Sequence, residues 1–185
     1  MDVACDACCL INFLAGEDIL SLASGAGDVS NVPMAQLFVP SAVARESLYV
    51  FQQDPNDPGG LIKAPIDLNP YFDAGVLQLC QIVAEEENDL FVRLAVNVDD
   101  GEAACLAIAK YRGMTVATDD RPASRLAAEM TVPVINTAQF LRRWAEKIGA
   151  SRDQIAAIIG RIERFARFIP RRDAADADWW FEHAS

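Results

Sequence analysis

Four acidic residues stand where an expected strand ends or an expected helix begins, and a fifth lies on an expected helix. Asp6 interrupts the apolar stretch "VACDACCLI", and Asp119 and Asp120 end the run "GMTVATDD". Glu46 lies on the helix expected after "QLFVP", and Glu102 in the first turn of the helix in "DDGEAACLAIAKYRG". Carboxylates that meet in a buried place repel one another, and a bound divalent cation removes that conflict. Oxygen ligands without His or Cys suit Mg²⁺ or Mn²⁺.

Most of these carboxylates also have an ordinary structural interpretation. Asp99 and Glu102 fit a D-x-x-E capping box, which needs no metal. Asp120 would cap the helix that follows it, and Glu46 would be a solvated helix residue. Asp6 resists such an interpretation, since a charge inside an apolar strand stabilises nothing. From spacing alone, the shared metal site and the separate caps both stay open.

The carboxylates need elements that bring them together, and the hydrophobic pattern predicts an α/β fold. Strands alternate with helices, which indicates a single domain with a central, mostly parallel β-sheet flanked by α-helices. Functional sites in such sheets form at the carboxyl ends of the strands. The expected strands cover 2–11, 36–40, 114–120 and 132–136, and the expected helices cover 41–51, 85–98, 99–112, 121–130, 137–148 and 151–169. The apolar stretch 13–23 follows the first strand, 54–60 reads as a loop, and 61–83 has no clear period.

The composition describes an acidic globular chain. Its 185 residues fit one domain, and a hydrophobic content of 52% is enough for a full core. The formal net charge of −11 argues against a broad nucleic-acid-binding surface. The start lacks a basic signal region and no apolar run is long enough for a membrane helix. We therefore expect a cytoplasmic protein with no membrane partner.

The cysteines read as reduced thiols. Their odd number, five, argues against a disulfide framework. Cys5 and Cys8 form a C-x-x-C pair, which would supply two of the four ligands of a zinc site. The chain has no second C-x-x-C pair and a single histidine, His183, so the other two ligands are lacking. We interpret the pair as small core residues.

Basic residues gather near the C-terminus, where nine lie between Arg142 and Arg172. Arg161, Arg164 and Arg167 recur every three residues, so they would share one side of a helix. They would either contact RNA phosphates beside an acidic site or form an ordinary solvated face. The aromatic cluster 179–181 would either dock on the core or insert into a partner.

Several motifs, in the right order, resemble those of PIN domains. "CDACCLINFLAG" resembles their opening strand and helix, and "LFVPSAVARES" their second strand and helix. "DDGEAACLAIAKYRGMTVATDDRPASRLA" resembles the part in which G-E-A precedes a helix and T-D-D-R follows a strand. The resemblance covers Asp2 to about Trp144. We therefore expect a PIN-like domain over 1–150 and a C-terminal extension over 151–185, made of an amphipathic helix and an aromatic tail.

The resemblance implies roles for particular residues. Its four acidic positions, taken as catalytic, correspond to Asp6, Glu46, Glu102 and Asp120, and its metal ligands to Asp6, Glu102 and Asp120, with Asp119 as a possible addition. Thr118 corresponds to a hydroxyl residue beside the last aspartate and would contact substrate. Similar domains are Mg²⁺- or Mn²⁺-dependent endoribonucleases, many of them VapC-like toxins with a protein antitoxin and often dimeric. RNA, an antitoxin and a second copy are thus the implied partners.

Two departures from the family pattern keep another function open. Cys8 stands where Ser or Thr is common, and the segment 55–97 matches poorly. A catalytically inactive PIN-like module that binds RNA or protein is therefore the alternative. A haloacid-dehalogenase-like phosphatase is disfavoured, because it would need D-x-D after the first strand and Asp6 is followed by Ala7 and Cys8.

Overall fold

A parallel sheet of five strands lies at the centre of the computed structural model, which describes residues 1–16 and 34–184. The strand order is β5-β2-β1-β6-β7, and every neighbouring pair is parallel. The strands are β1 (Asp2–Cys5), β2 (Gln36–Pro40), β5 (Leu77–Cys80), β6 (Thr115–Ala117) and β7 (Val134–Ile135). This sheet confirms the predicted α/β fold class.

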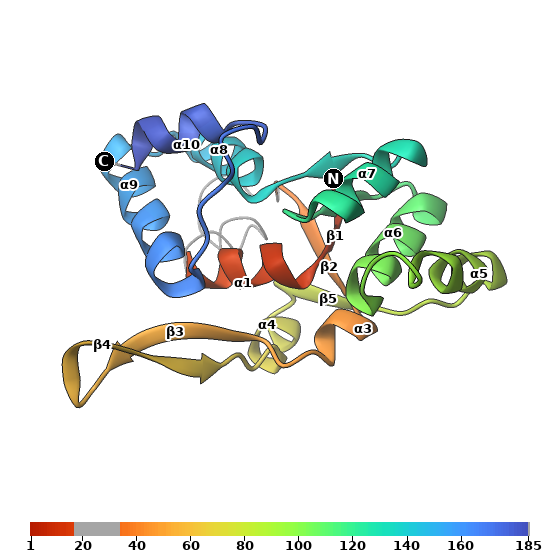
Figure 1. The fold of residues 1–185 in the computed structure, drawn as a ribbon, viewed down its shortest axis with the longest axis horizontal. Helices are drawn as coiled ribbons and strands as arrows, with labels where there is room; N and C mark the ends of the chain where they lie inside the picture. The colour runs from red at the N-terminus through yellow and green to blue at the C-terminus, as the bar shows by residue number, and fades with distance from the viewer. Residues whose placement is uncertain (17–33, 185) are drawn as a thin grey trace.

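Helices flank the sheet (Figure 1). They are α1 (Ala7–Ala15), α3 (Ser41–Ala44), α4 (Asn69–Asp73), α5 (Glu85–Leu94), α6 (Asp100–Arg112), α7 (Arg121–Glu129), α8 (Thr137–Ile148), α9 (Arg152–Arg161) and α10 (Ala177–His183). Val3, Ala4 and Cys5 of the central strand β1 are all fully buried. Since successive side chains point to opposite faces, both faces of the sheet are covered.

The strand ends that matter for function meet at one edge of the sheet. Ala4 lies opposite Val116, and Cys5 opposite Ala117, in the pairing of β1 with β6. The residues that follow these strands, Asp6 and Thr118, therefore come out side by side. Asp6 N also donates to the carbonyl oxygen of Ala117 at 3.1 Å, which ties the two strand ends together.

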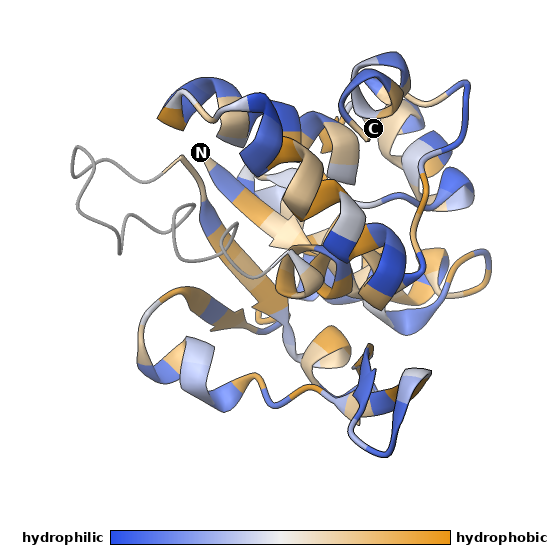
Figure 2. Cartoon of the chain, turned by 90° about the vertical axis from the view of Figure 1, so that its left-hand side faces the viewer, coloured by the Kyte–Doolittle hydropathy of each residue, from blue (hydrophilic) through white to orange (hydrophobic). Residues whose placement is uncertain are grey.

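The helix α6 contributes small side chains to the core together with two larger ones, Leu106 and Ile108. Ala103, Cys105 and Ala107 are fully buried, and α6 contacts β1, β2 and β6. Small residues let this helix approach the sheet closely. In Figure 2 the strands at the centre are mostly hydrophobic, whereas the surrounding helices carry both hydrophobic and hydrophilic residues.

The first predicted strand is shorter than expected. The strand β1 ends at Cys5 and α1 begins at Ala7, so the prediction of a strand over 2–11 is wrong beyond Cys5. The cause is Asp6, whose Oδ1 accepts a hydrogen bond from Ala7 N at 2.6 Å and caps the helix. Most of the apolar stretch 13–23 lies outside the described residues.

The prediction of a helix over 41–51 is wrong beyond Ala44, and a β-hairpin begins within its last three residues. The helix α3 ends at Ala44, and the chain then forms β3 (Tyr49–Asp54) and β4 (Asp57–Pro65), an antiparallel pair. The aromatic and β-branched residues of "YVF" pair with β4, which outweighs their apparent helical spacing. The hairpin projects from the body of the molecule (Figure 1). Its turn occupies part of the expected loop.

The expected C-terminal helix over 151–169 is also interrupted. α9 ends at Arg161, and the next turn, η1 (Ile162–Ala166), is π-helical. Arg167 then takes a left-handed conformation (φ 59°) and ends the helical path. The segment 168–176, which we call the strap, leads to α10. Trp180 of α10 is fully buried and donates from Nε1 to Glu163 Oε1 at 3.0 Å, so this tryptophan docks on the core.

Candidate metal centre

Asp6 is the most deeply buried carboxylate at the carboxyl edge of the sheet. Its side chain is 3% exposed. One oxygen caps α1, and the other, Oδ2, accepts hydrogen bonds from Thr118 Oγ1 and Cys8 Sγ, each at 3.0 Å. Burial raises the pKa of Asp6, and these hydrogen bonds oppose that rise.

Asp99 and Glu102 join Asp6 in one cluster. A carboxylate oxygen from each of these three residues lies within 4.8 Å of one from both of the others. Asp99 also caps α6, since its Oδ1 accepts from Glu102 N at 2.8 Å. The cap places both residues at the start of α6. Asp99 was missed as a candidate ligand because the capping pattern explained it fully; the signal was the doubled aspartate before "GE".

The pKa values of Glu102 and Glu46 are raised by burial and by the surrounding negative charge. The pKa of Glu102 rises to about 8, first because of burial and then because Asp6, Asp99 and Asp120 are close. The pKa of Glu46 rises to about 7, again through burial first and then through Asp99 and Asp6. Without a cation, the cluster therefore retains protons near neutral pH.

Gly101 makes room for Glu46 beside this cluster. A Cβ atom built on Gly101 would overlap Glu46 Oε1 and would contact a Val43 methyl group at 3.1 Å. The glycine of "DGEA" is thus explained by a close approach between α6 and Glu46, which lies two residues after the end of α3.

Asp120 lies at the start of α7. Its Oδ1 accepts from Ala123 N at 2.8 Å, and its own N–H donates to Thr118 Oγ1 at 3.1 Å. The expected helix cap is therefore present. Asp120 also lines the same cavity as Glu102 and contributes to the raised pKa of that residue, so it is both a cap and a neighbour of the cluster.

Asp119 is directed into a different set of contacts. Its Oδ1 accepts from Thr137 N at 3.0 Å, and its Oδ2 from Thr137 Oγ1 at 2.5 Å and Asn12 Nδ2 at 3.1 Å. These bonds join the end of β6 to α8 and α1. Burial raises the pKa of Asp119 and the hydrogen bonds lower it. Its role as a ligand stays a prediction.

Three observations now stand together: a parallel α/β sheet, carboxylates gathered at its carboxyl edge, and hydrogen-bond donors that orient them. A family model described as a PIN domain matches residues 2–172. The chain belongs to the PIN-domain family. A search of curated proteins and a search of solved structures each found no match.

The donor set of this PIN domain fits a divalent cation. Asp6, Asp99 and Glu102 offer hard oxygen ligands at mutual distances that a single ion can bridge. A second group of ligand atoms lies nearby, formed by Cys8, Cys9 and Asp119 within 4.8 Å of one another. The all-oxygen group suits Mg²⁺ or Mn²⁺.

Cys8 is not the core residue that we expected. Its side chain is half-buried and lines the cavity, its Sγ donates to Asp6 Oδ2, and it accepts from Asp119 N at 3.4 Å. The thiol therefore does for Asp6 what a serine hydroxyl would do. Thr118 is 1% exposed and holds both Asp6 and Asp120 in place, whereas its contact with substrate stays a prediction.

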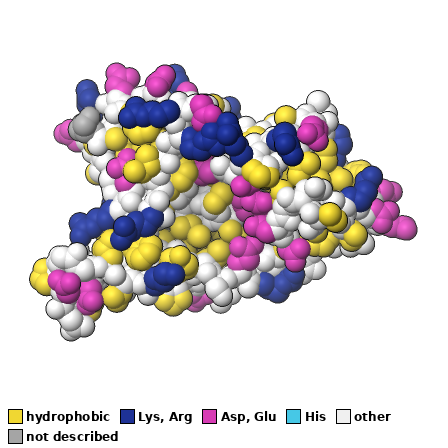
Figure 3. All heavy atoms as spheres, viewed as in Figure 1, with side chains coloured by type: hydrophobic (Ala, Val, Ile, Leu, Met, Phe, Trp, Pro, Cys, Tyr) yellow, Lys and Arg dark blue, Asp and Glu magenta, His cyan; other side chains and the backbone are white. Residues whose placement is uncertain are grey.

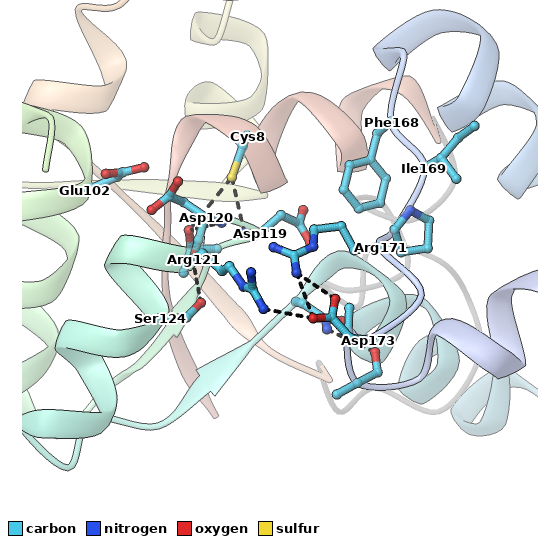
Figure 4. Close-up of a pocket in the computed structure, with 15 residues that line it drawn as sticks. Cys8, Glu102, Asp119, Asp120, Arg121, Ser124, Phe168, Ile169, Arg171 and Asp173 are labelled. Atoms are coloured by element: carbon cyan, nitrogen blue, oxygen red, sulfur yellow. Dashed lines mark hydrogen bonds and ion pairs between the residues drawn. The ribbon is translucent and has the colours of Figure 1, made fainter.

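A cavity of about 600 Å³ opens beside the carboxylates. Figure 4 shows Glu102, Asp120 and Cys8 on one side of it and the strap on the other. Its lining comprises Cys8, Glu102, Thr118, Asp119, Asp120, Arg121, Ser124, Asn136, Phe168, Ile169, Pro170, Arg171, Asp173, Ala174 and Ala175. The strap residues were not among the sequence candidates, because nothing local relates them to the carboxylates.

The three candidate arginines are not equivalent. Arg164 and Arg167 are exposed and face the hairpin, where Arg164 Nη2 donates to Gln53 Oε1 at 2.5 Å and Arg167 lies 4.8 Å from the Phe51 ring centroid. Arg161 is half-buried at the end of α9. The π-helical turn breaks the three-residue spacing that would have placed all three on one face. Figure 3 shows basic groups around a hollow with a largely hydrophobic floor and acidic groups at one end.

None of the helices in the described part of the chain is both long and apolar enough to span a membrane.

Proposed function

We propose that this PIN domain is a divalent-metal-dependent endoribonuclease that hydrolyses RNA phosphodiester bonds. The observation that carries the proposal is the cluster of Asp6, Asp99 and Glu102, of which Glu102 also lines a cavity of about 600 Å³. Mg²⁺ or Mn²⁺ is the cofactor that suits this donor set.

Each residue of the site has a role in this mechanism. Asp6, Asp99 and Glu102 would hold the ion, with Asp120 beside them and Asp119 as a possible further ligand. A bound Mg²⁺ or Mn²⁺ would supply an activated water and stabilise negative charge that develops on the phosphate. Thr118 keeps Asp6 and Asp120 oriented, and Cys8 supports Asp6. Glu46, adjacent to the cluster and with its pKa near 7, would accept or hold a proton.

RNA needs positive charge near such an acidic site. Arg164 and Arg167, exposed beside the hairpin, would contact phosphates away from the cleavage point, and Arg161 would contribute from the end of α9. Thr118 would approach the scissile phosphate. The hairpin adds another positive charge, that of Lys63, whose Nζ lies 4.0 Å from the centroid of the Tyr49 ring.

We further propose that the protein is the toxin of a cytoplasmic toxin–antitoxin pair, inhibited by a protein antitoxin and able to form a homodimer. The support is the family membership together with the cluster of carboxylates that could hold a metal ion. Growth arrest on expression, relieved by co-expression of a small neighbouring reading frame, would support this role. Unimpaired growth with an active nuclease would contradict it.

The nuclease proposal is tested first by calorimetric titration with Mn²⁺. The variants are Asp6→Asn and Asp120→Asn, which keep side chains able to cap α1 and α7. The control is Asp89→Asn, an exposed residue of α5. We expect saturable binding by the wild type and by Asp89→Asn, and loss in both site variants. Mn²⁺-dependent cleavage of single-stranded RNA should follow the same pattern.

The outcome that would reject the nuclease is a wild type that binds no Mn²⁺ either alone or with RNA. RNA binding without cleavage, in a protein that does bind Mn²⁺, would favour the catalytically inactive RNA-binding module. The inactive module stays a second candidate because a thiol, that of Cys8, stands where similar domains often have a hydroxyl.

A further inference from the structure

The strap is fixed across the cavity by contacts at several points. Asn136 Nδ2 donates to the carbonyl oxygen of Ala175 at 3.0 Å, and Arg142 Nη1 lies 2.8 Å from Asp176 Oδ1. Asp176, like Arg167 before the strap, has a left-handed backbone, with φ 58°. Non-glycine residues take that conformation uncommonly, and aspartate more readily than most. The strap is therefore held in place by other elements and forms one wall of the cavity.

Two arginines meet at Asp173 of the strap, Arg171 from the strap itself and Arg121 from the start of α7. Arg121 Nη2 lies 2.8 Å from Asp173 Oδ2, and Arg171 Nη2 lies 2.7 Å from the same oxygen. One carboxylate thus orients two guanidinium groups and leaves a net positive charge. Both arginines line the cavity that Asp120 and Glu102 also line. Figure 4 shows the guanidinium groups between Asp173 and the Asp119–Asp120 pair.

An apolar surface stands next to the arginines. Phe168, Ile169 and Pro170 line the same cavity, and Ile169 is 59% exposed. The ring of Phe168 packs edge-to-face against buried Trp180, with centroids 5.7 Å apart. This contact holds Phe168 in place from behind.

We propose that the strap and Arg121 form a nucleotide-binding subsite that takes one unpaired nucleotide of single-stranded RNA next to the scissile phosphate. Arg121 and Arg171 bind the backbone phosphate, and Phe168 with Ile169 and Pro170 contacts the base. This subsite rests on the proposed function in that the bound polymer is RNA.

The choice of an unpaired nucleotide follows from the arrangement of the groups. The charged and apolar parts line one cavity of about 600 Å³, within the usual range for sites that enclose a small organic ligand. A base can reach the apolar wall only when it is unstacked, as in single strands. Planar guanidinium groups match phosphate oxygens. The side chains of Arg121 and Arg171 are 70% and 49% exposed, so a phosphate can reach both.

The test measures fluorescence anisotropy of a labelled single-stranded RNA of about 12 nucleotides in EDTA, which prevents cleavage. Binding is followed between about 50 and 200 mM salt. The variants are Arg121→Ala, Arg171→Ala, Phe168→Leu and Ile169→Ser. The control is Arg125→Ala, on the same helix as Arg121, whose Nε lies 3.7 Å from Glu129 and whose side chain is 77% exposed.

Each arginine variant should weaken binding and reduce the slope of log Kd against log salt by about 0.7, the loss of one phosphate contact. Phe168→Leu and Ile169→Ser should weaken binding at least about fivefold with the slope unchanged. Arg125→Ala should match the wild type. Duplex RNA of the same sequence should compete poorly. Thermal melting shows whether Phe168→Leu is folded, and Ile169→Ser tests the apolar wall at an exposed position.

The subsite is rejected if the arginine variants keep the wild-type slope, or if Arg125→Ala lowers it as much as they do. The two proposals fail separately. A protein that binds RNA through these residues but never cleaves it refutes the nuclease and keeps the subsite. A protein that cleaves RNA while all four variants bind normally does the reverse.

Discussion

Thr118 Oγ1 lies 3.0 Å from Asp6 Oδ2 and donates a hydrogen bond to it, joining the end of β6 to the end of β1. The same hydroxyl oxygen accepts from Asp120 N at 3.1 Å. A single buried side chain therefore joins the carboxylate of Asp6 to the backbone of Asp120, two candidate catalytic residues that are far apart in the sequence.

Replacing this hydroxyl should weaken metal binding. Thr118→Val keeps the shape but leaves Asp6 Oδ2 and Asp120 N each without that partner, and we expect the Mn²⁺ affinity to fall by about tenfold. Thr118→Ser restores the hydroxyl and should bind close to the wild type. Calorimetric titration of both variants checks this, and equal affinities in Thr118→Val and the wild type would contradict the positioning role.

The raised pKa values predict a fall in stability as pH rises in the absence of metal. Glu102 has a folded-state pKa of about 8 against an ordinary 4.5, so the folded protein keeps a proton that the unfolded chain releases. This contribution is complete below about pH 4.5 and is lost as the pH rises to about 8. Glu46 adds a similar effect up to about pH 7.

Urea unfolding in EDTA at about pH 5 and about pH 8 measures this change. Glu102→Gln carries no charge at either pH, so its unfolding free energy should fall less than that of the wild type. Saturating Mn²⁺ should reverse the wild-type loss, since a cation stabilises the ionised cluster. Identical pH dependence in the two proteins would show that Glu102 does not titrate as described.

Gly101 and Gly160 form a matched pair of helical glycines with opposite surroundings. A Cβ at Gly101 would overlap Glu46 Oε1, whereas one at Gly160 meets nothing within 4 Å. Gly160→Ala should raise the unfolding free energy by about 0.5–1 kcal/mol through helix propensity alone. In Gly101→Ala the overlap with Glu46 should cancel this increase in unfolding free energy. The variant should also bind Mn²⁺ more weakly, because Glu46 must move. Denaturation and calorimetry on both variants distinguish them, and an unaltered site in Gly101→Ala would refute the close approach.

The ion pair between Arg112 and Glu87 should dominate the docking of α5 on α6. Glu87 is 3% exposed, its oxygens lie 2.7 and 2.9 Å from Arg112, and the hydrogen bond from Arg112 lowers its pKa to about 2. Arg112→Ala leaves this carboxylate buried without its cation, and we expect a loss of about 2–4 kcal/mol. The stabilisation is present above about pH 4.5 and is lost as the pH falls toward 2.

The matched control for this ion pair is Arg125→Ala. Arg125 and its partner Glu129 are both largely exposed, so their separation should cost less than about 0.5 kcal/mol. Chemical denaturation at neutral pH compares the two variants. A loss in Arg112→Ala no larger than in Arg125→Ala would mean that water replaces the buried pair at little cost.

The sequence by itself determined where the acidic side chains stand along the chain. Asp6, Glu102 and Asp120 were predicted at a strand end or a helix start, and the alternating pattern predicted the parallel sheet that gathers such positions at one edge. Local signals suffice here, because a cap needs only the residues next to it and a parallel strand needs only its own apolar run.

Only the tertiary structure decided which of these side chains meet. Asp119 and Asp120 are neighbours in sequence and both line the cavity, yet the carboxylate of Asp119 is held by Thr137 and Asn12 while that of Asp120 caps α7. Asp99, interpreted as a cap alone, joins Asp6 through the packing of α6 on β1. The direction of a side chain depends on partners that are distant in sequence, and a local pattern carries no record of them.

The same reason explains the hairpin and the strap. The stretch "YVF" has an apolar spacing that fits a helix or a strand, and its pairing with β4 selects the strand. The strap has no regular pattern, and its place over the cavity depends on Asn136, Arg142 and Arg121, which belong to other elements. Contacts between residues far apart in sequence decide the conformation of such segments. The strap could therefore be placed opposite the carboxylates only from the folded structure.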